Sequence, residues 1–577
     1  MTTIADHIVE SLKASGVDRV YGLSGDSLNG LTDAMRRNGT VDWVHVRHEE
    51  TGAYAAAAEA GLTGELTVCA GSCGPGNLHL VNGLFDANRS RVPVLAIAAH
   101  IPGAEIGSGY FQETHPQNLF AECSVYCELV SSAESAPRVL EMAMRAAVEE
   151  RGVAVVVVPG EVFLSKTDQG IEPTVVRAAG SVALPDRDSL TRAAELLNAG
   201  ERVTILAGAG AAGAHDDLVA LAGKLQAPIV HALRGAEHIA YDNPYDVGLT
   251  GLLGFASGYK AIDEADTLLM LGTDFPYRQF YPKRAKVIQL DLRGSQIGRR
   301  TRVDLGLVGS VRDTIPALLP LLAGKADGTH LERAREHYVK TRESLDSLAV
   351  NDHERTPIHP QLVASTISEL AADDAVFTTD VGSPVVWAAR YLRFNGRRRL
   401  LGSFNHGSMG CALPHAVGAQ AGSPGRQVVA LAGDGGLTMS LGELLTLKQN
   451  RLPVKVVVFN NSSLNFVELE MKAAGIVNYG TDLENPPLAD VATAMGLWGR
   501  RVERPGELEG ALKEAFEHDG PALVEVVTAR QELAVPPAIT LEQAKGFTLY
   551  AIRTILSGRG EELLDLVTTN VARRILH

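Results

Sequence analysis

The stretch Gln427–Met471, QVVALAGDGGLTMSLGELLTLKQNRLPVKVVVFNNSSLNFVELEM, predicts the architecture of the region around it. Val428–Ala432 and Val454–Phe459 are short apolar runs typical of buried parallel strands, and the leucines between them recur at helical spacing. The stretch therefore indicates one βαβ unit. Parallel strands place their carboxyl ends at one edge of a sheet, where open α/β sheets bind ligands.

Two polar residues follow these strands, and both suit a metal ion. Asp434 comes after the first run and Asn461 after the second. A carboxylate and an amide oxygen are hard ligands for Mg²⁺, which would take further oxygens from water and from a bound diphosphate. Gly433 and Gly435 would let the backbone approach those phosphates closely. A strand-end turn with purely conformational glycines is the alternative for an isolated Gly-Asp-Gly.

Length and composition bound the possible functions. A chain of 577 residues is too long for one hydrophobic core and indicates three or four domains. The net charge of −15 argues against a nucleic-acid partner and leaves no broad basic surface for anionic lipid. Five scattered cysteines predict no disulfide framework and fit a reducing cytoplasm. The N-terminal MTTIADHIVESL predicts an amphipathic helix rather than a signal peptide, and no apolar run approaches the ~20 residues of a membrane span.

The region from Met1 to about Val162 alternates helical segments with short apolar strands, which predicts a doubly wound parallel sheet. Within it, Arg47-His48-Glu49-Glu50 ends a strand-like segment and precedes a small-residue helix, Thr51–Ala60. Gly71–Asn77 is so rich in glycine that we expect a loop presenting its backbone to a ligand. The stretch from Ser165 to about Asp188 loses periodicity and gains prolines, as a linker does.

A second αβ region runs from about Ser189 to Leu322. Its strand Val203–Ala207 precedes Gly208–Gly213, formally G-x-G-x-x-G, but this motif is common by chance and no acid closes a convincing strand about 20 residues on, which disfavours NAD. Three further strand-end loops are either tight turns or the lining of a long nucleotide cofactor: Thr250–Phe255, Gly272–Arg278 and Gln289–Asp291.

The charged helix from about His330 to Ser347 and the loop Asn351–Pro360 precede a third αβ region, about Gln361 to Ala529. After it, Leu541–Leu556 and Glu561–Leu576 are predicted helices. The second helix has one apolar stripe at helical spacing with basic neighbours, which indicates either a helix docked on its own protein or an interfacial helix. The stripe is Leu563, Val567, Val571 and Ile575, and the neighbours are Arg573 and Arg574.

Several stretches together carry a family resemblance. The 24 residues between Gly-Asp-Gly and Asn-Asn resemble the diphosphate motif of thiamine diphosphate (ThDP) enzymes. With AGSCGPGNLHLVNGLFDANR, GSGYFQETHPQ, VHALRGAEH, YDNPYDVGLTGLLGF, GSFNHGSM and LEQAKGFTLY, essentially the whole chain resembles the flavin-containing pyruvate:quinone oxidoreductases of that family. The resemblance implies an α/β fold of three doubly wound parallel-sheet domains plus a helical tail, with ThDP held between two subunits. The implied domains are 1–182 for the pyrimidine, 183–334 for FAD, 335–530 for the diphosphate and Mg²⁺, and 531–577 for membrane association.

The resemblance also implies roles for individual residues. Glu49 matches the glutamate that hydrogen-bonds N1′ of the aminopyrimidine, and Met409 matches the residue that props ThDP in its bent conformation. Asp434, Asn461 and the carbonyl of Ser463 match the Mg²⁺ ligands. Phe466 matches an aromatic residue that aids electron transfer, while Phe111, Gln112 and Glu470 would face the substrate. The other matched positions are Gly407, Ser408, Gly435, Gly436, Ser462, Leu464 and Asn465 for ThDP, and Thr250, Gly251, Leu252, Leu253, Thr273, Asp274, Phe275, Pro276, Tyr277 and Asp291 for FAD.

The implied activity is oxidative decarboxylation of pyruvate to acetate and CO₂, with electrons passing through FAD to a membrane quinone. The expected enzyme is a homotetramer on the inner face of the cell membrane, bound to phospholipid by its C-terminal helix. Two features depart from the family: Asn465 stands where glycine is expected, and the end NVARRILH is longer and lacks a terminal tryptophan. Open alternatives are a pyruvate oxidase that uses phosphate and oxygen, and an acetolactate synthase, which needs no amphipathic C-terminus. Glu49, Asp434 and Asn461 disfavour a non-catalytic scaffold.

Overall fold

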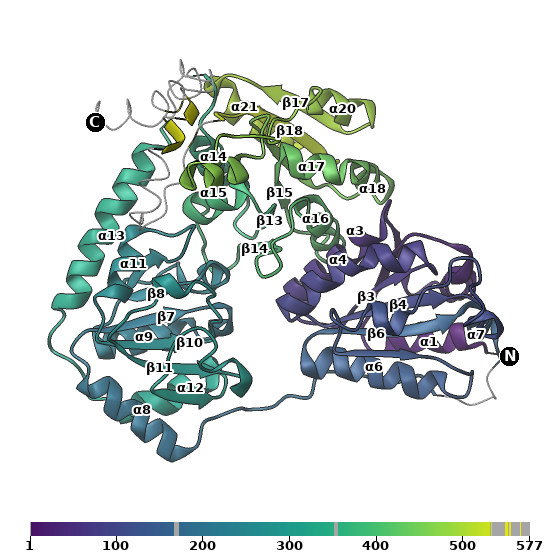
Figure 1. The fold of residues 1–577 in the computed structure, drawn as a ribbon, viewed down its shortest axis with the longest axis horizontal. Coiled ribbons are helices and arrows are strands. Elements are labelled where there is room, and N and C mark those ends of the chain that lie inside the picture. Colours follow the sequence, from purple (N-terminus) through teal and green to yellow (C-terminus); the bar gives the residue numbers. More distant parts are fainter. Residues whose placement is uncertain are drawn as a thin grey trace.

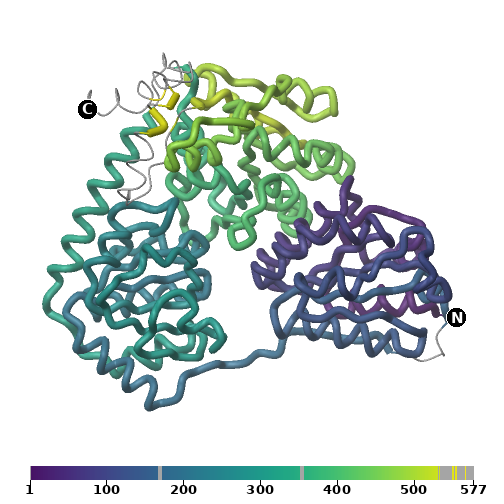
Figure 2. The backbone as a smooth tube through the Cα atoms, in the orientation of Figure 1, coloured from purple at the N-terminus to yellow at the C-terminus, as the bar shows by residue number. Residues whose placement is uncertain are grey.

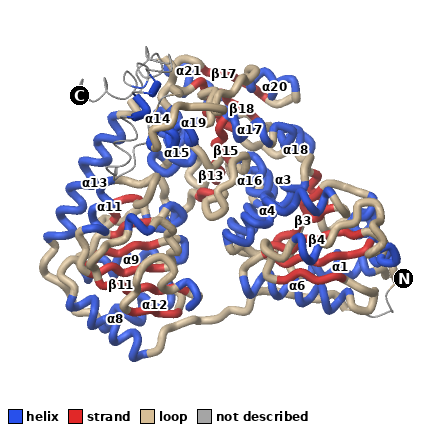
Figure 3. Tube along the Cα trace, in the orientation of Figure 1, coloured by secondary structure: helices blue, strands red, loops and turns tan. Residues whose placement is uncertain are grey.

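The computed structural model describes residues 2–166, 172–350 and 356–530, together with 532, 549–551, 553, 554 and 566. These residues form three lobes arranged as a triangle (Figure 1). Each lobe contains a six-stranded sheet whose paired strands are all parallel, and helices cover both faces of each sheet (Figure 3). The predicted α/β class with three doubly wound sheets is confirmed.

The first sheet has the strand order β2-β1-β3-β4-β6-β5. Its inner strands β4 and β6 are buried over their whole lengths, as expected for continuous apolar runs with helices on both faces. The strands are β1 (Arg19–Gly22), β2 (Asp42–His45), β3 (Thr67–Gly71), β4 (Val94–His100), β5 (Tyr126–Leu129) and β6 (Val153–Pro159). The helices are α1 (Ile4–Ala14), α2 (Asn29–Asn38), α3 (Glu49–Thr63), α4 (Pro75–Ser90), α5 (Pro116–Leu119), α6 (Ala136–Glu150) and α7 (Gly160–Leu164).

The central sheet has a different order, β12-β11-β10-β7-β8-β9, which is the arrangement of dinucleotide-binding sheets. Residues 172–186 lead into it without helix or strand and run between the first and central lobes (Figure 2). The strands are β7 (Val203–Ala207), β8 (Ile229–His231), β9 (Asp246–Leu249), β10 (Thr267–Leu271), β11 (Lys286–Asp291) and β12 (Leu305–Val308). The helices are α8 (Arg187–Ala199), α9 (His215–Leu225), α10 (Ala236–Ile239), α11 (Ala256–Asp263), α12 (Val311–Leu318) and the connecting α13 (Thr329–Ser347).

The third sheet, β14-β13-β15-β16-β18-β17, repeats the strand order of the first. The predicted βαβ unit is present, because β15 and β16 pair in parallel with Gly433 opposite Phe459. The strands are β13 (Val376–Thr379), β14 (Arg399–Gly402), β15 (Val428–Gly433), β16 (Lys455–Asn460), β17 (Trp498–Val502) and β18 (Ala522–Val527). The helices are α14 (Pro360–Leu370), α15 (Ser383–Tyr391), α16 (Ala412–Gly422), α17 (Asp434–Met439), α18 (Leu444–Gln449), α19 (Asn465–Ala473), α20 (Leu488–Ala494) and α21 (Pro505–Glu517).

The first and third domains share one hydrophobic core. Alanines of α3 and the apolar face of α16 belong to a single buried cluster, for example Ala56 and Val417. The two helices approach closely at Gly418, where an added Cβ would lie 1.9 Å from the carbonyl oxygen of Ala55. This packing brings the loops at the edges of the two sheets together.

Two predicted boundaries were wrong by a few residues. The helix predicted from Thr51 begins at Glu49, because His48 serves as its N-cap and accepts the backbone N–H of Glu50. The predicted loop Gly71–Asn77 ends early, because Pro75 occupies the first turn of α4.

The predicted C-terminal helices fall mainly outside the described residues. The apolar stripe Leu563, Val567, Val571 and Ile575, with Arg573 and Arg574, lies entirely there. Within Leu541–Leu556, the described residues 549–551, 553 and 554 are helical. Among the described residues, no helix combines the length and apolar character that a membrane span requires.

Candidate active site

Glu49 is a buried carboxyl held by two neighbours in the first domain. It is 5% exposed, and its Oε2 lies 2.9 Å from Nδ1 of His79 on α4. The glycine-rich loop packs against the other oxygen, since a Cβ added to Gly76 would lie 3.0 Å from Oε1. A carboxyl bonded to an imidazole can hold or exchange a proton, which suits general acid–base chemistry.

His79 was not predicted from the sequence as a site residue. Its position one helical turn into α4, directly after the glycine-rich loop, was the only available signal. Its ring stacks on that of His48 with a centroid distance of 4.3 Å. The ligand atoms of His48, Glu49 and His79 lie within 4.8 Å of one another, so this group could also hold a metal ion. The two rings are near-parallel, at 26°, and Nδ1 of His79 is already bonded to Glu49, an arrangement that also suits proton transfer.

Asn82 of α4 joins this side of the site to the third domain. Its amide nitrogen donates to Glu50 Oε1 at 2.6 Å and to Ser408 Oγ at 3.3 Å. Its amide oxygen lies 2.8 Å from Nε2 of His406. The loop that carries Gly407, Ser408 and Met409 therefore faces the first domain within a single chain. That ThDP lies between two subunits stays a prediction, because one chain is described.

Asp434 is the best candidate metal ligand of the third domain. It opens α17 at the end of β15, is 2% exposed, and accepts a hydrogen bond from the amide of Asn485 at 2.8 Å. No lysine, arginine or histidine of the described chain pairs with it, and burial raises its pKa to about 6 despite backbone hydrogen bonds. A buried carboxylate whose partners are all neutral amides fits a hard cation such as Mg²⁺.

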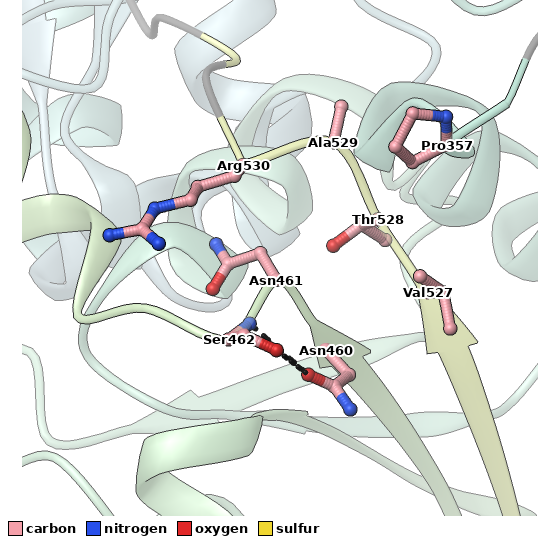
Figure 4. Close-up of a pocket in the computed structure, with 8 residues that line it drawn as sticks. All are labelled: Pro357, Asn460, Asn461, Ser462, Val527, Thr528, Ala529 and Arg530. Carbon is pink, nitrogen blue, oxygen red and sulfur yellow. Dashed lines mark hydrogen bonds between the residues drawn. The ribbon is translucent and has the colours of Figure 1, made fainter. Parts of the chain in front are cut away.

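The loop after β16 supplies the other predicted ligands. Asn461 lines a pocket of about 230 Å³, and its Oδ1 accepts the backbone N–H of Ser463 at 3.0 Å. Figure 4 shows the side chains of Asn461 and Arg530 on the same side of that pocket. The pocket is lined by Pro357, Asn460, Asn461, Ser462, Val527, Thr528, Ala529 and Arg530.

Glu468 fixes this ligand loop, and sequence reasoning missed it. It is fully buried on α19 and accepts hydrogen bonds from Ser463 Oγ at 2.5 Å and Thr481 Oγ1 at 3.0 Å. Burial alone would raise the pKa of Glu468. Hydrogen bonds from the guanidinium of Arg530 and the hydroxyl of Ser463 outweigh burial, so the pKa lies below its usual value. The backbone around Ser463 is thereby tied to α19. The amide of Asn465, the departure from the family pattern, ties the start of α19 to the carbonyl of Arg530.

The predicted substrate-facing residues fall into two groups. Gln112 lies beside the glycine-rich loop, where the Cys73 thiol donates to its Oε1 at 3.2 Å. Its backbone is left-handed, with φ of +64°, a strained conformation for glutamine that is common at functional sites. Phe111, next to it, is exposed.

The second group lies on α19 of the third domain. Phe466 packs at the edge of the third-domain core, and Glu470 is exposed. Burial, and then the nearby carboxylate of Glu470, raise the pKa of Tyr277 in the central domain. Phe466 packs against the same apolar cluster as Leu253 of the central domain.

The central loops predicted to hold FAD occupy the carboxyl ends of β9, β10 and β11. Thr250 is buried, and its Oγ1 has no hydrogen-bond partner among the described residues. Asp291 is a buried acid at the end of β11, and burial raises its pKa. An unpaired hydroxyl and a strand-end acid fit the hydroxyls of a nucleotide. Asp274, by contrast, is engaged by the guanidinium of Arg300 at 2.8 Å.

The remaining FAD-loop residues pack on each other and on neighbouring glycines. Gly251 has φ of +97° and lies against Phe275, whose ring meets that of Tyr277 edge to face. Leu252 and Pro276 belong to the same two loops. The G-x-G-x-x-G glycines have a packing role here, since a Cβ on Gly208 would lie 2.7 Å from Thr273 Cβ and from the Gly272 carbonyl oxygen.

The third domain holds one of these loops directly. Arg390 of α15 is buried, and its Nε donates to the carbonyl oxygen of Leu253 at 3.1 Å. Burial lowers its pKa to about 10. A second link joins Glu237 of the central domain to Arg399 of β14 at 3.0 Å. The central loops are thus fixed beside the domain that carries Asp434.

Comparisons with known proteins find similarity along nearly the whole chain. Three family models of thiamine pyrophosphate enzymes match the chain: the N-terminal binding domain over residues 2–119, the central domain over 190–318 and the C-terminal binding domain over 380–526. The Bacillus subtilis protein YdaP, provisionally named as thiamine pyrophosphate-containing, is 36% identical over 98% of both chains. Pyruvate oxidase of Lactiplantibacillus plantarum is 29% identical over 90% of this chain and 87% of its own. The large subunit of acetolactate synthase isozyme 2 of Escherichia coli is 30% identical over 90% and 95%.

Proposed function

The chain belongs to the thiamine diphosphate enzymes, of the pyruvate oxidase and acetolactate synthase kind, and we propose that it decarboxylates pyruvate oxidatively to acetate. Electrons leave through FAD in the central domain to a membrane quinone. The observation that carries the flavin route is the contact between Arg390 and Leu253, which fixes a predicted FAD loop against the third domain.

The residues divide the work around the cofactor. ThDP, when bound, would supply a nucleophilic carbon for the pyruvate ketone and a thiazolium ring that takes up the electron pair left when CO₂ departs. Glu49 would hold a proton at N1′ of the aminopyrimidine, with His79 fixing the carboxyl. Met409 and the backbone around it would support the pyrimidine from the third domain. Asp434, Asn461 and the Ser463 carbonyl would hold Mg²⁺ against the diphosphate.

The position of α19 supports electron transfer toward the central domain. Phe466 and Glu470 share this helix. Phe466 packs against the same apolar cluster as Leu253 of a predicted FAD loop, and the carboxylate of Glu470, after burial, raises the pKa of Tyr277. The Tyr277 loop packs in turn against Gly251 and its neighbours. A flavin held by these two loops would therefore lie beside the helix predicted to meet the substrate.

An anaerobic single-turnover experiment tests this proposal. The full chain, loaded with ThDP, Mg²⁺ and FAD, is mixed with pyruvate while flavin absorbance and products are followed. We expect loss of the oxidised-flavin absorbance together with equal amounts of acetate and CO₂, and reoxidation when a soluble quinone analogue is added. The matched control is Glu49→Gln, whose flavin should be reduced by dithionite but not by pyruvate.

Other products would identify the alternatives. Acetolactate formed while the flavin stays oxidised would replace the proposal by a synthase. Acetyl phosphate formed in phosphate buffer, with rapid reoxidation of the flavin by oxygen, would replace it by a phosphate-dependent oxidase. A chain that binds no FAD would remove the flavin route altogether.

We further propose that the C-terminal segment brings the enzyme to the membrane as a peripheral protein on the inner face. The support is the sequence pattern alone, an apolar stripe with basic neighbours that can lie among lipid headgroups. Deleting Glu561–His577 should leave pyruvate-driven flavin reduction intact and abolish co-sedimentation with liposomes in the presence of pyruvate and ThDP. Full-length protein that stays in the supernatant under those conditions would refute this part of the proposal.

A further inference from the structure

Asp380 is a buried carboxylate to which none of the roles above assigns a function. It follows β13 directly, is 2% exposed, and forms no ion pair with any described residue. Oδ1 accepts the backbone N–H of Ala412 at 2.8 Å, and Oδ2 accepts that of Gly433 at 3.1 Å. Burial raises its pKa to about 6, while the backbone N–H groups of Ala412, Gly433 and Gly410 act in the opposite direction.

The two oxygens bind two different cofactor loops. Ala412 closes the loop after β14 that carries Gly407, Ser408 and Met409, on the pyrimidine side. Gly433 opens the loop after β15 that carries Asp434, on the diphosphate side. β13 lies between β14 and β15 in the sheet, and the connections from β13 and β14 run to opposite sides of it. Asp380 therefore lies at the topological switch point of the sheet, where open α/β sheets bind ligands.

Gly436 accommodates this arrangement. A Cβ at that position would lie 2.0 Å from Asp380 Oδ2, so a larger residue would push the carboxylate out of place. Gly410 approaches from the pyrimidine side, where an added Cβ would meet the carbonyl oxygen of Gly436 at 3.3 Å. Asp380, Gly410 and Gly436 thus pack as one unit between the loops.

We propose that Asp380 is a positioning residue that fixes the separation of the pyrimidine-binding and diphosphate-binding loops. A ligand that spans both loops binds tightly only when their spacing is preset, because otherwise it must order one loop relative to the other. A ligand that touches one loop does not need that spacing. The inference rests on ThDP being the cofactor, and it is independent of the flavin and of the quinone.

The test compares one spanning ligand with two that do not span. Asp380→Asn keeps the size of the side chain but places an amide NH₂ against backbone N–H groups, since an amide has only one acceptor oxygen. The matched control is Asp374→Asn, the same change at an exposed position at the other end of β13. Binding of ThDP with Mg²⁺, of pyrophosphate with Mg²⁺, and of thiamine is measured by titration calorimetry on the full chain.

We expect Asp380→Asn to weaken ThDP binding about 10- to 100-fold, the range for hydrogen bonds to a charged group. Pyrophosphate and thiamine should bind as they do to the unmodified chain, and kcat at saturating ThDP should be retained. Should Asp380→Asn not fold, Asp380→Ser removes the same carboxylate and should give the same pattern. An equal loss of affinity for ThDP and for pyrophosphate would show that Asp380 supports only one loop, which would overturn the inference. Unchanged affinity for ThDP would also refute it. An unmodified chain that does not bind ThDP would instead overturn the cofactor assignment.

Discussion

The first and third domains share a strand order but use their sheets differently. In the first domain, the segment after the second strand carries Glu49, which is bonded to His79 and suited to proton handling. In the third domain, the loop after the third strand carries Asp434, which is bonded only to amides and suited to a cation. The same topology therefore gives one half of the candidate site an acid suited to proton transfer and the other half an acid suited to a metal ion.

The difference between the two domains is clearest at the topological switch point of each sheet, where the strand order changes direction. Between β13 and β15 lie two buried carboxylates, Asp380 and Asp434. The equivalent point between β1 and β3 has glycine and serine, and a Cβ on Gly25 would lie 2.3 Å from Ser72 Oγ. The topology determines where a ligand can bind, and the side chains at that point determine what chemistry the ligand meets.

The largest expected effect comes from the first domain. Glu49→Gln should lower kcat by about 10²–10⁴ because the neutral amide cannot exchange a proton at N1′. Affinity for ThDP should stay near that of the unmodified chain. Turnover is measured with pyruvate and a soluble electron acceptor, and the control is Glu65→Gln, an exposed position beyond the end of α3. Normal turnover by Glu49→Gln would show that the first domain does not supply the acid–base group.

The corresponding change in the third domain should affect binding rather than chemistry. Asp434→Ala should weaken Mg²⁺-dependent ThDP binding by on the order of 100-fold. Losing a residue that only orients a metal ligand costs about 10- to 100-fold in metal affinity, and losing the ligand itself should cost at least as much. Removing Mg²⁺ from the unmodified chain with a chelator should give the same loss and should add little to the variant. If chelation left ThDP affinity unchanged, Asp434 would not be a metal ligand.

The partner of Asp434 gives a smaller test. Asn485→Ala removes the amide that orients the carboxylate, and such outer partners are worth about 10- to 100-fold in metal affinity. We expect weaker Mg²⁺ activation and an unchanged kcat at saturating metal. Measured activation curves that overlay those of the unmodified chain would show that the Asn485 contact does not matter.

Changing His79, the partner of Glu49, should lower kcat and leave cofactor affinity unchanged, and this should be the smallest effect. His79→Gln retains a hydrogen-bonding group near Oε2 but cannot become charged, so we expect kcat to fall about tenfold. Affinity for ThDP and Mg²⁺ should not change. A variant with reduced ThDP affinity and normal kcat would place His79 with the binding residues.

The βαβ unit and its strand-end residues could be predicted from sequence because periodicity and glycine spacing are local signals. Asp380 and Glu468 could not be found that way, because each is a single acid with no motif. Their importance arises from groups far away in the chain, such as the backbone N–H of Ala412 for Asp380 and the guanidinium of Arg530 for Glu468. The early start of α3 escaped prediction because histidine is not a preferred N-cap residue.

Exchange of the thiazolium C2 proton of bound ThDP, followed by NMR in deuterated buffer, tests the division between the two domains most directly. At saturating cofactor, Glu49→Gln should exchange this proton at least about 100-fold more slowly than the unmodified chain. Asn485→Ala, saturated with Mg²⁺ and ThDP, should exchange it at the unmodified rate. Fast exchange in Glu49→Gln, or equally slow exchange in both variants, would contradict the assignment of proton handling to the first domain.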